Sequence, residues 1–126
     1  MPDNRFNNGQ QFGLLGNNMG VGVAVGNVTT VASTASYTVF PGWGDKVRVL
    51  GVAGVMTGAG AASDTVKLTD GSNDITNTVD VSSLSDTDFF WFDQVDDAYH
   101  ETTAENLTVA TASDATCEVY VFVART

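Results

Sequence analysis

The sequence has little of several residue types, and each scarcity excludes a class of function. Among its 126 residues Cys117 is the only cysteine, so no disulfide can form within the chain. Five basic residues stand against fifteen acidic ones, which gives a formal net charge of −10. Nucleic acid and anionic membranes repel such a chain, so we expect neither as a partner. The sequence has no apolar run near the ~20 residues of a membrane span and no signal-peptide pattern at its N-terminus.

Convergent titratable side chains are also scarce. The single histidine, His100, stands among carboxylates, and no second histidine could complete a catalytic pair or a metal site. Asp93, Asp96 and Asp97 could offer hard oxygen ligands to Ca²⁺, but they lack the alternate spacing and the glycine of an EF-hand loop. We therefore predict a protein that is not an enzyme and that has no cofactor and no metal. The acidic loop 93–105 remains an open candidate for a cation.

Strand-forming residues and turn residues dominate the composition, whereas most helix formers are scarce. The length fits one domain with an extension at the N-terminus. About eight short strands alternate with turn signals, and no stretch has a helical period. We predict an all-β fold, an antiparallel β-sandwich of the jelly-roll type, over residues 28–126. The predicted strands are 28–31, 37–40, 46–55, 64–69, 74–81, 89–92, 107–111 and 116–124, with a turn at 70–73 and a hairpin joining the last two strands. Gly51 and Gly54 indicate a bulge or a close backbone approach.

Two of these strands are apolar on both faces. In the last strand Cys117, Val119, Val121 and Val123 share one face, which we assign to the core, with Cys117 as a buried structural thiol. The other face carries Tyr120 and Phe122. The run Phe89–Phe92 is likewise apolar on both sides. A strand with two dry faces needs partners on two sides, so we expect one set of contacts within the chain and a second set between subunits.

Residues 1–27 differ from the rest of the chain. They are rich in glycine and asparagine, almost free of charge, and carry spaced hydrophobic residues. Glycine loses much entropy on ordering, so this segment cannot fold alone. We predict an extended arm that orders on another surface, although 21–25 could extend as a strand. Its candidate anchors are Phe6, Phe12, Leu14 and Leu15.

A carbohydrate-binding sandwich is the alternative function. Aromatic rings on a sandwich can stack on sugars, and Trp43 lies in the loop sequence Pro41-Gly42-Trp43-Gly44. The competing interpretation is that Trp43 packs over one end of the sandwich, and the sequence leaves both interpretations open.

From residue 28 onward a rhythm of strands and turns covers about three-quarters of the chain. Its elements are Thr29-Thr30-Val31, Tyr37-Thr38-Val39-Phe40-Pro41, Asp45-Lys46-Val47-Arg48-Val49, Asp64-Thr65-Val66-Lys67-Leu68-Thr69-Asp70-Gly71, Ile75-Thr76, Val79-Asp80-Val81-Ser82-Ser83-Leu84, Leu107-Thr108-Val109 and Val119-Tyr120-Val121. In this rhythm the chain resembles the small jelly-roll decoration (cement) or head-fibre proteins of tailed bacteriophages.

The resemblance implies a homotrimer on the outer surface of a phage head that bridges neighbouring copies of the major capsid protein and stabilises the shell. It also implies that the N-terminal arm reaches across the capsid or a neighbouring subunit. The chain would then be made in the bacterial cytoplasm and end in the virion. For the subunit interface of such a trimer we assign Phe90, Phe92, Tyr120 and Phe122.

Overall fold

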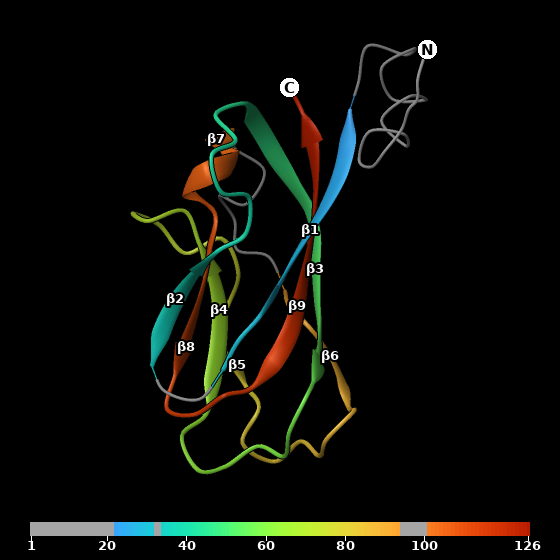
Figure 1. Ribbon diagram of the computed structural model, residues 1–126, viewed down its shortest axis with the longest axis vertical. Coiled ribbons are helices and arrows are strands. Elements are labelled where there is room, and N and C mark those ends of the chain that lie inside the picture. The colour runs from blue at the N-terminus through green and yellow to red at the C-terminus, as the bar shows by residue number, and fades with distance from the viewer. Residues whose placement is uncertain (1–21, 32–33, 94–100) are drawn as a thin grey trace.

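A computed structural model describes residues 22–31, 34–93 and 101–126 (Figure 1). These residues form nine strands and one short 3-10 turn, η2. The elements are β1 (Val23–Thr29), β2 (Ala35–Thr38), β3 (Lys46–Met56), β4 (Thr65–Thr69), β5 (Val79–Asp80), β6 (Phe89–Trp91), β7 (Thr102–Thr103), η2 (Ala104–Asn106), β8 (Thr108–Ala112) and β9 (Cys117–Arg125).

The strands form two antiparallel sheets that pack face to face. The five-stranded sheet has the order β1-β9-β3-β6, with β7 also paired to β3, and the four-stranded sheet has the order β2-β8-β4-β5. In Figure 1 the strands β9, β3 and β6 of the first sheet lie to the right, and the strands β2, β8 and β4 of the second lie to the left. This arrangement confirms the predicted all-β antiparallel sandwich.

The core lies between the sheets and follows the period of two along each strand. In β9 the four side chains predicted to face inward are fully buried, and Cys117 is among them. In β4 Val66 and Leu68, two residues apart, are likewise fully buried. Branched aliphatic side chains fill most of this space because they pack well on a pleated surface. The whole core set is Val39, Phe40, Val47, Val49, Val52, Met56, Val66, Leu68, Ile75, Val81, Phe90, Phe92, Ala104, Leu107, Val109, Ala115, Cys117, Val119, Val121 and Val123.

A bulge in β3 changes which side chains face the core. The register against β9 shifts between Val49 and Gly51, which confirms the predicted irregularity. Leu50 is exposed at this point, and the burial pattern then resumes one residue out of phase. Val52 is therefore buried, whereas simple alternation from Val47 places it on the opposite face. Simple alternation fails at Val52 because the bulge inserts one residue.

The first sheet starts earlier in the chain than predicted. The boundary between arm and domain at 27/28 falls inside β1, which pairs with β9 from Val23 onward. The extension that the sequence offered for 21–25 is thus part of a strand from Val23. In the second sheet the predicted strand 37–40 is found as β2 at Ala35–Thr38, and Val39 and Phe40 follow it as buried core residues.

The predicted hairpin between the last two strands is wrong. β8 pairs with β2 and β4 in one sheet, while β9 pairs with β1 and β3 in the other. The short link after β8 crosses the sandwich, and two contacts hold it there. The amide of Asp114 donates to Asp64 Oδ1 at 3.0 Å, and the Ala115 carbonyl accepts from Thr30 Oγ1 at 2.9 Å. Each strand has its own dry face to bury, so sequence proximity does not decide the pairing.

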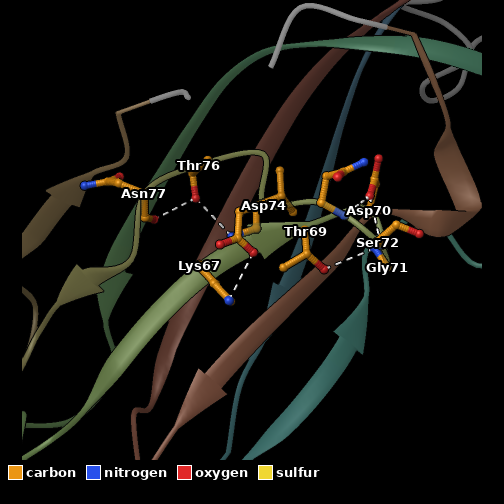
Figure 2. A network of polar contacts seen from close by, with 10 residues as sticks. Lys67, Thr69, Asp70, Gly71, Ser72, Asp74, Thr76 and Asn77 are labelled. Carbon is orange, nitrogen blue, oxygen red and sulfur yellow. Dashed lines mark hydrogen bonds and ion pairs between the residues drawn. The ribbon is translucent and has the colours of Figure 1, made fainter. Parts of the chain in front are cut away.

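The turn after β4 has the predicted position. The amide of Asp70 donates to the Asn73 carbonyl, and Asp70 Oδ1 accepts from the amide of Asn73 at 2.7 Å (Figure 2). The returning chain makes only one bridge, Thr69 to Asp74, before its pairing with β4 becomes irregular. Regular pairing resumes at β5, where Val79 lies opposite Val66.

Candidate interaction surface

The outer face of the five-stranded sheet collects most of the exposed apolar side chains. Seven large hydrophobic residues of the described chain are exposed, and six of them belong to strands of this sheet. Phe89 and Trp91 stand out, with 77% and 75% of their surface exposed. We call this set the aromatic face: Val23, Val25, Leu50, Phe89, Trp91, Phe122 and the half-buried Tyr120.

Strand register places these side chains in rows across the sheet. Ala53 of β3 lies opposite Tyr120 of β9 on one side and opposite Trp91 of β6 on the other. One step along, Val55 lies between Glu118 and Phe89 in the same way. The small side chains of β3 therefore lie between larger side chains of β6 on one side and of β9 on the other.

A shallow apolar hollow follows from this arrangement. It has a volume of about 210 Å³, and β3, β6 and β9 all contribute to its lining. The lining residues are Ala53, Gly54, Val55, Phe89, Phe90, Trp91 and Tyr120. Exposed apolar side chains that border a hollow on one face of a sheet are typical of binding surfaces.

Polar groups border the hollow on the β9 side. Asn27 Nδ2 donates a hydrogen bond to Glu118 Oε2 at 2.7 Å. A hydrogen bond with Glu118 raises the pKa of the Tyr120 hydroxyl, and desolvation and the negative charge of Glu118 add to the shift.

The outer face of the other sheet has a different character. Its hollow of about 210 Å³ is lined by Thr65, Lys67, Thr78, Ala110, Thr111 and Ala112. Lys67 Nζ pairs with Asp74 Oδ1 at 3.0 Å, and Thr76 Oγ1 accepts from the Leu68 amide at 3.0 Å (Figure 2). These contacts attach the irregular segment after the turn to β4. Lys67, the charged residue of this hollow, is thus engaged in a structural ion pair.

The assignment of Phe90 and Phe92 to a subunit interface is corrected by the structure. Both are core residues, 6% and 7% exposed, and their rings lie 5.3 Å apart between centroids. The outward residues of this run are Phe89 and Trp91, which the sequence analysis did not assign. Alternation shows that the run has two faces but not which one turns outward, and the deciding signal is Gly54, opposite Phe90 on β3.

The other two interface candidates lie on the outer surface. Phe122 is 41% exposed, and Tyr120 is half-buried on the same face. They belong to the aromatic face, so the structure brings them together with Phe89 and Trp91 rather than with Phe90 and Phe92.

Trp43 does not belong to the aromatic face. It is half-buried against the core, and its ring centroid is 5.1 Å from that of Phe40. Its carbonyl accepts from the amide of Glu105, which ties the loop to η2. Packing over the sandwich, the second of the two interpretations of Trp43, agrees with these contacts.

Several sequence candidates lie outside the described residues. They are the arm anchors Phe6, Phe12, Leu14 and Leu15, and in the acidic loop Asp96, Asp97 and His100. Within 22–31, 34–93 and 101–126 no three histidine, cysteine or acidic side chains gather as a metal site. In the same ranges no helix has the length and apolar character that a membrane span requires.

Cys117 has the predicted structural role. Burial raises the pKa of its thiol, and the hydrogen bond with Thr30 offsets part of that rise. A neutral buried thiol is a poor nucleophile, so Cys117 acts as a small apolar core residue.

Comparison with known proteins adds no assignment: no family model, no curated protein and no solved structure matches this chain.

Proposed function

We propose that the protein is a structural subunit of a virus particle, a homotrimer that decorates the outside of a phage head. The observation that carries the proposal is the aromatic face, with Phe89 and Trp91 three-quarters exposed on a rigid sheet. Aromatic side chains are enriched at protein interfaces, and leaving two such rings in water is costly. Contact between subunits through this face removes them from solvent.

The order of the strands supports a jelly roll, the fold that the resemblance to decoration proteins implies. The pairing is nested: β1 with β9, β2 with β8, and β4 with β5. β3 pairs with both β6 and β7, which lie along it as one interrupted strand. This order results when a long antiparallel ribbon of paired strands folds over on itself, as in a jelly roll. In the folded ribbon β3 pairs with β9 and β4 pairs with β8.

The acidic charge supports an external position on the particle. A chain of net charge −10 is repelled by packaged DNA but not by the outside of a shell. In this function the protein binds the expanded shell and stabilises it by mass action, because a ligand that binds one state alone shifts the equilibrium toward that state. The arm residues Phe6, Phe12, Leu14 and Leu15 supply apolar anchors to the major capsid protein.

Solution mass tests the self-association. By light scattering in dilute solution we expect three times the 13.2 kDa of one chain. The double substitution Phe89→Ser and Trp91→Ser should reduce the mass in dilute solution to that of one chain, because it removes the apolar contact without changing the core. Val31→Ser is the matched control, since Val31 is 62% exposed but lies outside the sheet. A trimer that persists in the double variant would refute the role of the aromatic face.

Co-sedimentation with expanded phage shells tests the arm. Deletion of residues 1–21 should abolish binding while the fold is kept, because β1 begins only at Val23. Retained binding would remove the arm from the mechanism and leave the sandwich surface as the contact.

Carbohydrate binding is the second candidate, and one observation favours it. The exposed Trp91 and the half-buried Tyr120 lie on either side of Ala53 in the sheet. Glu118 and Asn27, which are hydrogen-bonded to each other, lie beside Tyr120. Aromatic rings with a nearby carboxylate and amide suit a sugar ring, which has both apolar and hydroxyl faces. In a glycan-binding assay this candidate predicts loss of binding with Trp91→Ala and retained binding with Trp43→Ala. It also predicts that neither of these two substitutions changes the oligomeric state.

A further inference from the structure

β1 is a long sheet edge with no strand on its outer side among the described residues. It has seven residues and pairs only with β9. The other edge strands are shorter: β2 has four residues, β6 has three and β5 has two. A free strand edge presents a row of unpaired N–H and C=O groups that another strand can bind.

The hydrogen bonds at the two ends of β1 identify which backbone groups face outward. The Thr30 amide donates to the Cys117 carbonyl at 2.8 Å, and the Arg125 amide donates to the Gly22 carbonyl at 2.8 Å. Both pairs belong to the same register, and in an antiparallel ladder the bonded pairs alternate. The even-numbered residues of β1 therefore bond to β9. Odd-numbered residues, which are Val23, Val25, Asn27 and Thr29, direct their N–H and C=O groups away from the sheet.

The edge lacks the devices that normally prevent strand addition. β1 contains no charged residue and no proline, and its pairing with β9 has no register shift. Val23 and Val25 are 38% and 54% exposed, so apolar side chains accompany the unpaired backbone. The sequence from Phe6 to Gly44 contains no charged residue, although the chain as a whole is strongly acidic.

We propose that β1 pairs, antiparallel and about a two-fold axis, with β1 of a second copy of this chain. The axis passes through Gly26, the midpoint of Val23–Thr29, because only this register pairs the strand along its whole length. Val25 then lies opposite Asn27 of the second copy, and Val23 lies opposite Thr29. All four residues carry outward backbone groups, so the register satisfies them reciprocally, as an isologous interface requires.

Charge explains why a second copy fits this edge. Two chains of net charge −10 repel each other, so they can meet at backbone distance only where carboxylates are absent. β1 meets that condition. The edge at β5 includes Asp80, and β6 is flanked by Asp88 and Asp93. β1 is thus the long uncharged edge of an acidic molecule.

The two-fold contact is separate from the contact through the aromatic face. It uses main-chain groups of β1, whereas the aromatic face is centred on side chains of β6 and β9. It joins two five-stranded sheets edge to edge and places their aromatic faces on one continuous surface.

Amide hydrogen exchange of the full-length chain, resolved by residue with NMR, tests the proposal. The amides of Ala24, Gly26 and Val28 should be protected at every protein concentration, because they bond to β9. In contrast, the amides of Val23, Val25, Asn27 and Thr29 should exchange fast in dilute solution and about tenfold or more slowly in concentrated solution. The Phe89→Ser and Trp91→Ser double variant should keep this pattern, since the edge does not depend on the aromatic rings.

Three results would overturn the proposal. Odd-numbered amides that exchange fast at all concentrations would show a free edge. Protection that does not depend on concentration would assign the edge to a segment of the same chain. A mass that rises with concentration while these amides stay unprotected would assign all association to the aromatic face.

A pair of double variants tests the register. Val25→Lys with Asn27→Lys places lysine opposite lysine across the axis and should abolish the concentration-dependent protection. Val25→Asp with Asn27→Lys places aspartate opposite lysine and should retain it. Both variants put a lysine beside Glu118, so they differ only at residue 25. Equal behaviour of the two variants would contradict the axis at Gly26.

Discussion

Gly54 and Phe90 lie opposite each other on β3 and β6, and the phenyl ring occupies the space that a side chain at Gly54 would need. A β-carbon at Gly54 would overlap that ring. The missing side chain thus lets Phe90 turn inward, where it packs against Phe92. Because strand side chains alternate, Phe89 and Trp91 must then turn outward. One glycine in the core determines which aromatic residues the protein offers to a partner.

Substitution of this glycine should destabilise the fold. We expect Gly54→Ala to lower the free energy of unfolding by about 1–3 kcal/mol, the usual cost of overpacking a core. Gly51→Ala is the matched control, because a β-carbon at Gly51 meets no atom within 4 Å. It should change stability by less than about 1 kcal/mol. Urea unfolding of both variants measures the difference, and equal stabilities would refute the role of Gly54.

Thr30 should stabilise the link between the sheets through its hydroxyl. The group accepts from the Cys117 amide at 2.9 Å and donates to the Ala115 carbonyl at 2.9 Å, and Thr30 is 1% exposed. Thr30→Val keeps the shape but leaves two buried backbone groups unpaired, so we expect a loss of about 2–4 kcal/mol. The exposed neighbour provides the control, and Thr29→Val should stay within about 0.5 kcal/mol. Chemical denaturation compares the two variants, and a small effect at Thr30 would mean that these groups find other partners.

Asp80 should make stability depend on pH in the acid range. Hydrogen bonds from the side chain and the backbone of Ser82 hold the pKa of this exposed carboxyl below its usual 3.8. A lowered pKa in the folded state means that the contribution is complete above 3.8 and disappears as the pH falls through the folded value. Asp80→Asn should therefore lower the melting temperature slightly at about pH 7, and this difference should shrink as the pH falls below 3.8. A difference that persists in acid would point to a cause other than the charge.

Much of the fold was predictable because burial in β-sheets leaves a period of two in the sequence. Cys117, Val119, Val121 and Val123 illustrate this, as every second residue of the strand is apolar and buried. The turn at Asp70 was predictable for a different reason, since aspartate accepts hydrogen bonds from amides two and three residues on. Both signals are local.

The errors concern relationships that are not local. The link from β8 to β9 is as short as that of a hairpin, yet it crosses between sheets, and contacts from the distant Thr30 and Asp64 hold it there. The bulge at Leu50 changes the face of Val52 through pairing with β9. The inward turn of Phe90 depends on Gly54, far away in the sequence. Each of these depends on a partner strand that the sequence does not identify.

Tryptophan fluorescence should report directly which surface is covered when chains associate. The two tryptophans differ in environment, because Trp91 is 75% exposed and Trp43 packs half-buried against Phe40. In the variant Trp43→Phe only Trp91 emits. As protein concentration rises, its emission should shift to shorter wavelength and acrylamide should quench it less, because association through the aromatic face removes the indole from water.

The variant Trp91→Phe provides the control for this measurement. Only Trp43 then emits, and its spectrum and quenching should not change with concentration, since its ring already lies against Phe40 within one chain. The emission of Trp91 could instead stay at long wavelength and fully quenchable by acrylamide while the mass of the particle in solution increases. That result would show that the chains associate without covering β6. The edge of β1 would then remain as the contact between copies, because its pairing leaves the β6 ring in water.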